Sequence, residues 1–488
     1  MDTLISIKPL LAVLVSLAVV PLIASSRTPN LREGWTFLAA ILKFALVASM
    51  LPAVLGGREI SCTLFEVLPG LSLAFRVDAF GMLFALVASF LWIITSAYSI
   101  GYMRGLDEHA QTRYFCFFAV SLSAAVGVAF SANLLTLYLF YEMLSLATYP
   151  LVTHHQDEEA RTSGRKYLLY TVGASIGLVL PAMLMTYHLT GSLDFSAQGV
   201  LAGNAPRATV ALLLFMFVFG FAKAAVMPLH SWLPAAMVAP TPVSALLHAV
   251  AVVKVGVFSI FRTLSGIFGT ELLAAMDLGV WVAAIACVTI LTGSLIALSQ
   301  DNLKRRLAFS TIAQLSYIVL GVGLLSAKGL TGGMIHIAMH AFGKITLFFC
   351  AGAIFVATGK KNISEMKGIG RQMPVTMGAF FIGALSVIGL PPTGGFLSKW
   401  YLALGSLDAG LWPVLVVLLT SSLLNAFYFL PIVFRAFFNA VEPEHEPSGG
   451  LSEAPMWCVL PPAIAAAGSV ALFFYPDIFI NLARLALG

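Results

Sequence analysis

Five ionisable side chains lie in stretches of sequence that otherwise have the composition of membrane spans. Lys223, Lys254, Lys344 and Lys399 each interrupt an apolar run, and Glu142 is the one carboxylate in such a run. An ionisable group at bilayer depth costs at least about 2.5–3.5 kcal/mol, so it normally faces a protein interior and serves an ion pathway or a proton relay. One such group alone is also compatible with a structural role at a helix break. Five together favour a relay.

Histidines extend this chemistry. His336, His340 and Lys344 are spaced at i, i+4 and i+8, which places them on one face of a helix. Two more histidines lie close in sequence to the buried lysines, His230 and His248. Histidine titrates near neutrality, and lysine can do so when it is desolvated. A chain of these groups bridged by water is therefore predicted to relay protons.

Glu142 is the available counter-charge for a lysine such as Lys223, because a Glu–Lys pair lets the lysine keep its charge until the two separate. A metal site at His336 and His340 is the weaker interpretation, since no Cys, Asp or Glu nearby completes it. The five cysteines form no cluster, so we expect no iron–sulfur centre, no metal and no other cofactor. Lys43 has no helix breaker or titratable partner nearby, which favours a structural or lipid-facing role.

The composition indicates the kind of fold that must position these ionisable side chains. Of 488 residues 59% are hydrophobic and 10% charged, and the mean hydropathy is +0.95. This indicates a polytopic membrane protein, and the long apolar runs predict an all-α fold, because lipid offers no partner to backbone polar groups. The net charge of +5 then reflects membrane topology and not nucleic-acid binding.

Spans of about 20 apolar residues predict fourteen helices, near 3–24, 34–55, 79–103, 112–130, 131–153, 165–190, 207–229, 243–265, 275–299, 304–325, 331–358, 375–404, 411–438 and 456–480. Of the 27 lysines and arginines, 15 fall in the alternate set of loops that starts after the first helix, and six fall in the opposite set. Because such residues concentrate in cytoplasmic loops, both termini are expected outside the cytoplasm.

Two of these helices are predicted to be broken. The breakers are Pro228 and Pro234 in helix 7, and Pro391, Pro392 and Gly394 in helix 12. Broken helices are typical of transporters, and each break adjoins a buried lysine. Because the breaks lie five helices apart, we predict two inverted five-helix repeats. The expected divisions are residues 1–111 (helices 1–3), 112–265 (the first repeat), 266–438 (the second repeat) and 439–488 (a loop and helix 14).

Several segments resemble the antiporter-like subunits, a family that spans the proton-pumping subunits of respiratory complex I, the large subunits of Mrp-type cation/proton antiporters and their counterparts in membrane-bound hydrogenases. The matching segments are 98–103, 141–142, 221–234, 239–249, 301–311, 340–344 and 389–396. The resemblance covers roughly helices 3 to 13. It implies fourteen core helices, the inverted repeat and a polar axis along the membrane midplane.

The resemblance also implies a role for each polar residue. Glu142 and Lys223 are similar to the ion pair of the first half-channel, and Lys254 to the central connecting lysine. Lys344 resembles the next link, together with His336 and His340. Lys399 resembles the terminal residue of the relay on helix 12, although the M-type subunit of complex I carries glutamate there.

The function expected from this resemblance is that of a proton-translocating subunit in a multisubunit complex of a prokaryotic cytoplasmic membrane. The sequence stops soon after helix 14, without the extensions of L-type and Mrp A subunits, which favours the Mrp D subunit and Na⁺/H⁺ exchange. The alternative is a complex I N-type or hydrogenase subunit, driven by redox chemistry elsewhere. A quinone-binding or structural subunit would not need four midplane lysines. Expected partners are homologous and small membrane subunits, protons, Na⁺ or K⁺, and lipid.

Overall fold

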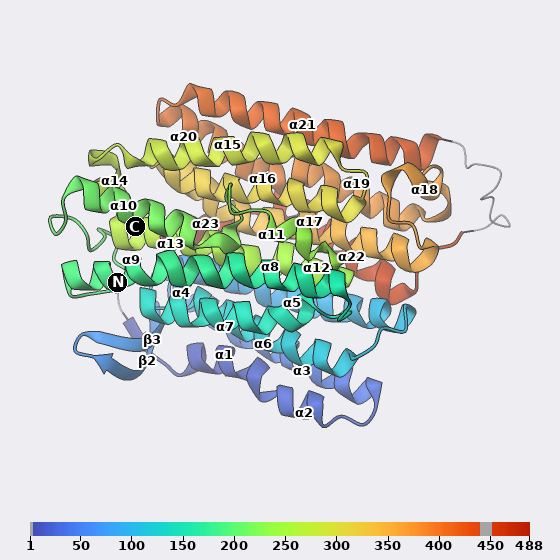
Figure 1. Cartoon of the computed structure of the whole chain (residues 1–488), viewed down its shortest axis with the longest axis horizontal. Helices are drawn as coiled ribbons and strands as arrows, with labels where there is room; N and C mark the ends of the chain where they lie inside the picture. The colour runs from blue at the N-terminus through green and yellow to red at the C-terminus, as the bar shows by residue number, and fades with distance from the viewer. Residues whose placement is uncertain (1–2, 440–450) are drawn as a thin grey trace.

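Helices dominate the computed structural model, which describes residues 3–439 and 451–488. Within those residues, eleven helices are long and apolar enough to cross a membrane. Three shorter apolar helices accompany them, Lys8–Ala24, Arg207–Gly220 and Pro374–Ile388. Figure 1 shows most of the helices running side by side along the long axis of the molecule. The chain is therefore a mostly helical, polytopic membrane protein, as expected.

The helices of the first half follow the apolar runs closely. They are α1 (Lys8–Ala18), α2 (Val20–Ala24), α3 (Pro29–Ala48), α4 (Leu51–Leu55), α5 (Ala79–Gly105), α6 (Gln111–Ala129), α7 (Leu134–Val152), α8 (Glu158–Ala174), η1 (Ser175–Val179), α9 (Leu180–Thr190), α10 (Arg207–Gly220), η2 (Ala222–Ala224), α11 (Trp232–Ala235), η3 (Ala236–Val238), α12 (Thr241–Ala245), η4 (Leu246–Val250), α13 (Val252–Thr263) and η5 (Leu264–Phe268).

The second half has longer uninterrupted helices. They are α14 (Thr270–Ala275), α15 (Leu278–Ser299), α16 (Leu303–Gly323), α17 (Ala327–Thr358), η6 (Ile363–Glu365), α18 (Ile369–Gln372), α19 (Pro374–Ile388), α20 (Gly394–Asp408), α21 (Trp412–Phe438), α22 (Met456–Phe474) and α23 (Asp477–Leu485). Much of the loop expected before the last apolar span, residues 440–450, lies outside the described part of the chain.

A small sheet shows that the expectation of an all-α chain is wrong at one place. Its strands are β1 (Thr3–Ile5), β2 (Glu59–Leu68) and β3 (Leu71–Val77), in the order β1-β2-β3. β1 pairs parallel with β2, and β2 pairs antiparallel with β3 around Pro69-Gly70. Proline and glycine between two apolar segments are a turn signal. The strong hydropathy of the flanking spans outweighs that signal, so the sequence pattern alone predicts a loop between them.

α17 forms the centre of the second half. It is 32 residues long, about 48 Å at 1.5 Å per residue, and it is buried almost continuously from Gly329 to Ile354. Five long helices pack around it, α5, α16, α19, α20 and α22. A helix buried on all sides can hold polar side chains away from lipid. α17 carries His336, His340 and Lys344.

Both predicted helix breaks are present. α10 ends at Gly220, and the chain passes through the 3₁₀ turn η2 before α11 begins at Trp232, so Pro228 lies in the break and Pro234 in the short helix after it. α19 ends at Ile388 and α20 begins at Gly394. Pro391 and Pro392 occupy the gap between them.

Candidate functional site

Lys223 lies in the first helix break, on the 3₁₀ turn η2, and is fully buried. Its Nζ donates a hydrogen bond of 2.7 Å to the carbonyl oxygen of Tyr141 and lies 3.1 Å from the centre of the Tyr141 ring. The backbone N–H of Lys223 also donates to the Tyr141 hydroxyl, at 3.1 Å. α7 therefore fixes both ends of the lysine through one tyrosine.

Glu142 does not form the direct ion pair with Lys223 that the family resemblance implied. Within the described residues Lys223 bonds to Tyr141 instead, and Oε1 of Glu142 is buried without a hydrogen-bond partner. The physical reason is helical rotation: successive residues point about 100° apart, so Tyr141 faces the break and Glu142 lies beside it. The two charges are still close enough to interact.

Gly256 brings the first break against the helix that carries Lys254. A Cβ on Gly256 would lie 2.1 Å from the backbone nitrogen of Ala224 and 2.3 Å from the carbonyl carbon of Lys223. Real Cβ atoms do not approach backbone so closely, so only glycine permits this contact. Lys223 and Lys254 thus belong to two elements in direct backbone contact.

Lys254 continues the chain of polar groups into α17. Its Nζ lies 2.6 Å from Nδ1 of His340, and both side chains are buried. One turn earlier on α17, Nδ1 of His336 lies 2.8 Å from Oγ of Ser398 on α20. The His336 and His340 rings are 5.6 Å apart. This path ends one residue from Lys399.

Lys344 leads along a second branch. Its Nζ donates to Oγ of Ser310 at 2.7 Å, and the hydroxyl oxygen of Tyr428 lies 2.9 Å from the same Oγ. Tyr428 also bonds to Asn425, whose amide nitrogen donates to the carbonyl oxygen of Val387 at 3.4 Å. Val387 is in turn a partner of Lys399.

Lys399 closes the end of α19. Its Nζ donates to the carbonyl oxygens of Val387 and Ile388, both at 2.9 Å, and to Oγ of Ser422 at 3.1 Å. These carbonyls lie at the C-terminal end of α19, where no further helical turn can bond them. A cation there is favoured by the helix dipole as well as by the hydrogen bonds.

Two predicted residues stand apart from this chain. His248 is fully buried on η4, 4.7 Å from the Phe348 ring, and neither of its ring nitrogens has a hydrogen-bond partner in the described structure. His230 is only half-buried, and its Nδ1 contacts the carbonyl oxygen of Pro228 at 3.2 Å. His230 lines a cavity at one end of the molecule.

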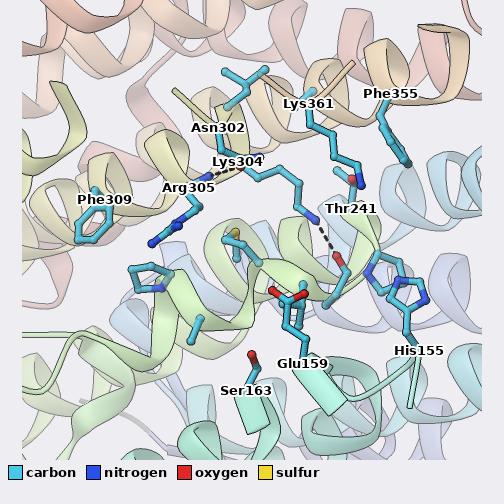
Figure 2. Close-up of a pocket in the computed structure, with 18 of the residues that line it drawn as sticks. His155, Glu159, Ser163, Thr241, Asn302, Lys304, Arg305, Phe309, Phe355 and Lys361 are labelled. Carbon is cyan, nitrogen blue, oxygen red and sulfur yellow. Dashed lines mark hydrogen bonds between the residues drawn. The ribbon is translucent and has the colours of Figure 1, made fainter. Parts of the chain in front are cut away.

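That cavity, of about 790 Å³, is a feature that the sequence did not reveal. In Figure 2, Lys304, Arg305 and Lys361 lie on one side of it, with Glu159 and Ser163 opposite. Lys304 reaches across to donate a hydrogen bond of 2.6 Å to the carbonyl oxygen of Ala239. The charged residues that line the cavity come from the loops after α5, α7 and α17 and from the helices α8 and α16, so only the fold brings them together.

Two further buried charges were also missed or left open. Arg262 on α13 makes a two-point ion pair with Asp78, the N-cap of α5, although both had the sequence context of loop residues. Lys43 is fully buried, donates to the carbonyl oxygen of Leu122 at 3.2 Å and lies 5.7 Å from the Trp92 ring. The lipid-facing alternative for Lys43 is therefore wrong.

Comparison with known proteins places these groups in a family. The family model described as NADH:quinone oxidoreductase/Mrp antiporter, transmembrane region, matches residues 131–425, which include the polar chain from Glu142 to Lys399; Tyr428 of the second branch lies just beyond the match. Subunit N of the NADH-quinone oxidoreductase of Desulforudis audaxviator is 37% identical over 369 residues, 74% of this chain and 72% of the relative.

Two longer relatives match more of the chain. The NAD(P)H-quinone oxidoreductase subunit 5 of Paulinella chromatophora is 33% identical over 83% of this chain, and the Na⁺/H⁺ antiporter subunit A1 of Staphylococcus aureus is 30% identical over 92%. The matches span 61% and 58% of those two proteins.

Solved structures share the fold. A chain in the Mrp complex from Dietzia sp. DQ12-45-1b superposes with a TM-score of 0.86 at 22% identity, over 99% of this chain and 96% of that one. A chain in an archaeal membrane-bound sulfane sulfur reductase gives 0.87 at 24% identity, over 99% and 97%. With its buried lysines, broken helices and matched sequence, the chain belongs to the NADH:quinone oxidoreductase/Mrp antiporter transmembrane family.

Proposed function

We propose that this chain is a proton-translocating, antiporter-like subunit of a multisubunit membrane complex. The single observation that carries the proposal is the contact of 2.6 Å between the buried side chains of Lys254 and His340. Two titratable groups facing each other away from lipid cost stability and can exchange a proton. The named relatives are subunits of an Na⁺/H⁺ antiporter and of quinone oxidoreductases. Homology to these subunits supports the proposed function.

The proposed route follows the polar contacts. Protons would pass from Lys223 to Lys254, then through His340 and His336 toward Lys399, while Lys344 connects along its own branch. Glu142 would tune the charge of Lys223 without touching it.

Water is the natural bridge where direct contacts stop. Buried polar atoms normally have partners, and polar cavities hold ordered water. Several atoms along the route have no hydrogen-bond partner in the described structure, namely Nε2 of His336, Nε2 of His340, both ring nitrogens of His248, the hydroxyl of Tyr317 and the amide of Gln314. His248 would join the route through such waters, and His230 would lie where the cavity meets it.

We also propose that the three shorter apolar helices complete fourteen membrane crossings, with two inverted repeats in residues 112–265 and 266–438, flanked by residues 1–111 and 439–488. Two helix breaks, each next to a buried lysine, support the repeat. The C-terminus and the sheet that includes β1 lie at the same end in Figure 1, as an even number of crossings requires. The cation count favours an orientation with that end outside the cytoplasm.

The experiment replaces the first two members of the route. We expect Glu142→Ala and Lys223→Ala to abolish proton transport by the assembled complex in reconstituted vesicles, without loss of assembly. Lys328→Ala is the matched control, because Lys328 is exposed and pairs with Asp408 at the surface. Wild-type transport in the Glu142 or Lys223 variant would refute the route.

Two driving modules remain candidates. The resemblance favours an Mrp-type antiporter, with this chain most like its D subunit and exchanging Na⁺ or K⁺ for protons. The higher identity to subunit N favours a redox complex instead, in which electron transfer elsewhere drives the pump. Purifying the native complex and identifying its subunits separates them: small Mrp partners indicate the antiporter, and nickel–iron or quinone-reductase subunits indicate the redox pump. We assign no cofactor to this chain in either case.

A further inference from the structure

Three histidines converge on one carboxylate at the end of the molecule opposite the sheet. Glu108 and His109 lie in the loop after α5, and His154 and His155 in the loop after α7. Oε2 of Glu108 is 3.6 Å from Nε2 of His154, 3.8 Å from Nδ1 of His155 and 3.9 Å from Nδ1 of His109. Two loops that lie more than 40 residues apart in sequence thus supply four side chains to one point.

His154 is the informative member of this cluster. Its side chain is fully buried, yet neither ring nitrogen has a hydrogen-bond partner in the described part of the chain. Its ring lies 4.7 Å from that of His109 and 5.6 Å from that of His155. A buried polar group of this kind normally has a partner, and here Nε2 points to the carboxylate from beyond hydrogen-bond distance.

We propose that Glu108, His109 and His154, with His155 beside them, bind a divalent transition-metal ion of the Zn²⁺ class. Ligand atoms of the first three all lie within 4.8 Å of one another. Zinc bonds of about 2.0–2.2 Å to nitrogen and oxygen place tetrahedral ligands roughly 3.3–3.5 Å apart. The observed separations of 3.6–3.9 Å from the shared oxygen exceed that by a few tenths of an ångström, within the reach of side-chain rotation.

The ligand set selects the class of ion. Imidazole nitrogens suit Zn²⁺, Cu²⁺, Ni²⁺ and Fe²⁺, whereas Mg²⁺ and Ca²⁺ take oxygen ligands. Three tetrahedral positions would be filled by Glu108, His109 and His154, and the fourth by His155 or water. Metal binding at this point would tie the loop after α5 to the loop after α7.

The side chains of the cluster also shift one another's pKa. Burial raises the pKa of Glu108, but the rings of His154, His155 and His109 outweigh it and hold the pKa of this carboxyl below its ordinary value. Burial lowers the pKa of His155, which Glu108 offsets only in part. The carboxyl and the rings are therefore electrostatically coupled.

The surroundings link the cluster to the cavity described above. Glu108 and His155 line that cavity, together with Lys304 on α16 and Asp157. Arg113 on α6 also faces the cluster, donating to the carbonyl oxygen of His154 at 2.8 Å. A bound ion would therefore lie in the cavity wall, beside the other charged side chains that line it. The site itself does not depend on the proposed transport activity.

The test measures binding of Zn²⁺ and Co²⁺ to the full chain, purified without a polyhistidine tag and stripped by a chelator. We expect about one equivalent to bind, with Co²⁺ giving the visible absorption of a tetrahedral N/O site.

Three variants decide whether this cluster is the site. His109→Ala and Glu108→Gln should each weaken binding at least tenfold, and His109 is half-exposed, so its loss does not threaten folding. His188→Ala is the matched control, because His188 is an exposed histidine at the end of α9. Equal affinity in wild type and His109→Ala, or no binding by correctly folded wild type, would overturn the proposal.

Discussion

The sharpest test of the relay is at Lys399, because two substitutions there separate its charge from its proton. Lys399→Arg keeps a cation that can donate to the carbonyls of Val387 and Ile388. Arginine does not release its proton in proteins, whereas a desolvated lysine can. Lys399→Met removes both the charge and the donors.

The expected slowing of proton release in Lys399→Arg follows from the difference in pKa between arginine and lysine. The pKa of arginine lies roughly 2–3 units above that of lysine, which is about 10.4 in the reference state. Proton release should therefore be about 100- to 1,000-fold slower if Lys399 is an obligatory carrier. Assembly should be retained, because the cation at the end of α19 is kept.

The expected change in stability for Lys399→Met follows from the hydrogen bonds that the substitution removes. The Ile388 carbonyl would lose the Lys399 ammonium, whereas the Val387 carbonyl keeps the Asn425 amide at 3.4 Å. One orphaned buried carbonyl costs about 1–3 kcal/mol, and removing a buried charge offsets part of this. We expect a small fall in the unfolding temperature and complete loss of transport.

The assay is the rate of proton uptake by vesicles that contain the assembled complex, followed with a pH-sensitive dye. Lys328→Arg, at an exposed surface pair, is the control for the effect of arginine itself. A Lys399→Arg complex that pumps at more than half the wild-type rate would show that Lys399 supplies only a fixed charge. The reasoning about proton release would then be refuted.

Three further predictions concern packing and buried charge. Gly256→Leu should lower stability by about 1–3 kcal/mol and impair transport, because a Cβ at position 256 would lie 2.1 Å from backbone. Gly378→Leu should change neither stability nor transport in the same melting and uptake assays, because a Cβ at position 378 has nothing within 4 Å. Arg262→Ala should destabilise the protein by about 1–3 kcal/mol, measured by thermal unfolding, since the half-buried Asp78 would lose its ion partner and keep only the Gly81 N–H; an unchanged melting temperature would contradict this. Lys43→Met should leave proton uptake at the wild-type rate, and lost uptake in an intact complex would extend the relay to α3.

Local signals explain why most of the fold was predictable from sequence. Long apolar runs fix helices because lipid leaves the backbone no other partner, and Pro228 and Pro391 mark breaks through their missing N–H groups. The buried lysines stood out for the same reason, by their cost. The strands β2 and β3 were missed because a short loop segment beside strong spans carries only a turn signal at Pro69.

Features that depend on the third dimension could not be predicted. Tyr141, and not Glu142, faces Lys223. Neighbouring residues on a helix differ by about 100° in direction, so a predicted helix boundary that is uncertain by one residue cannot tell which of the two faces the lysine. The second branch through Ser310 and Tyr428 joins side chains 118 residues apart. Likewise, Glu108 and His154 meet only because α6 and α7 return the chain to the same end.

The Lys399 ammonium bonds to the end of α19, so the protonation of Lys399 and the conformation of that helix end are coupled. A neutral lysine holds the Val387 and Ile388 carbonyls less strongly than an ammonium does. Proton loss therefore loosens the helix end, and by reciprocity any displacement of α19 changes the proton affinity of Lys399. A displacement of α19 by a neighbouring subunit would then change the protonation of Lys399. A proton arriving along the proposed relay would restore the ammonium and, with it, the original position of the helix end.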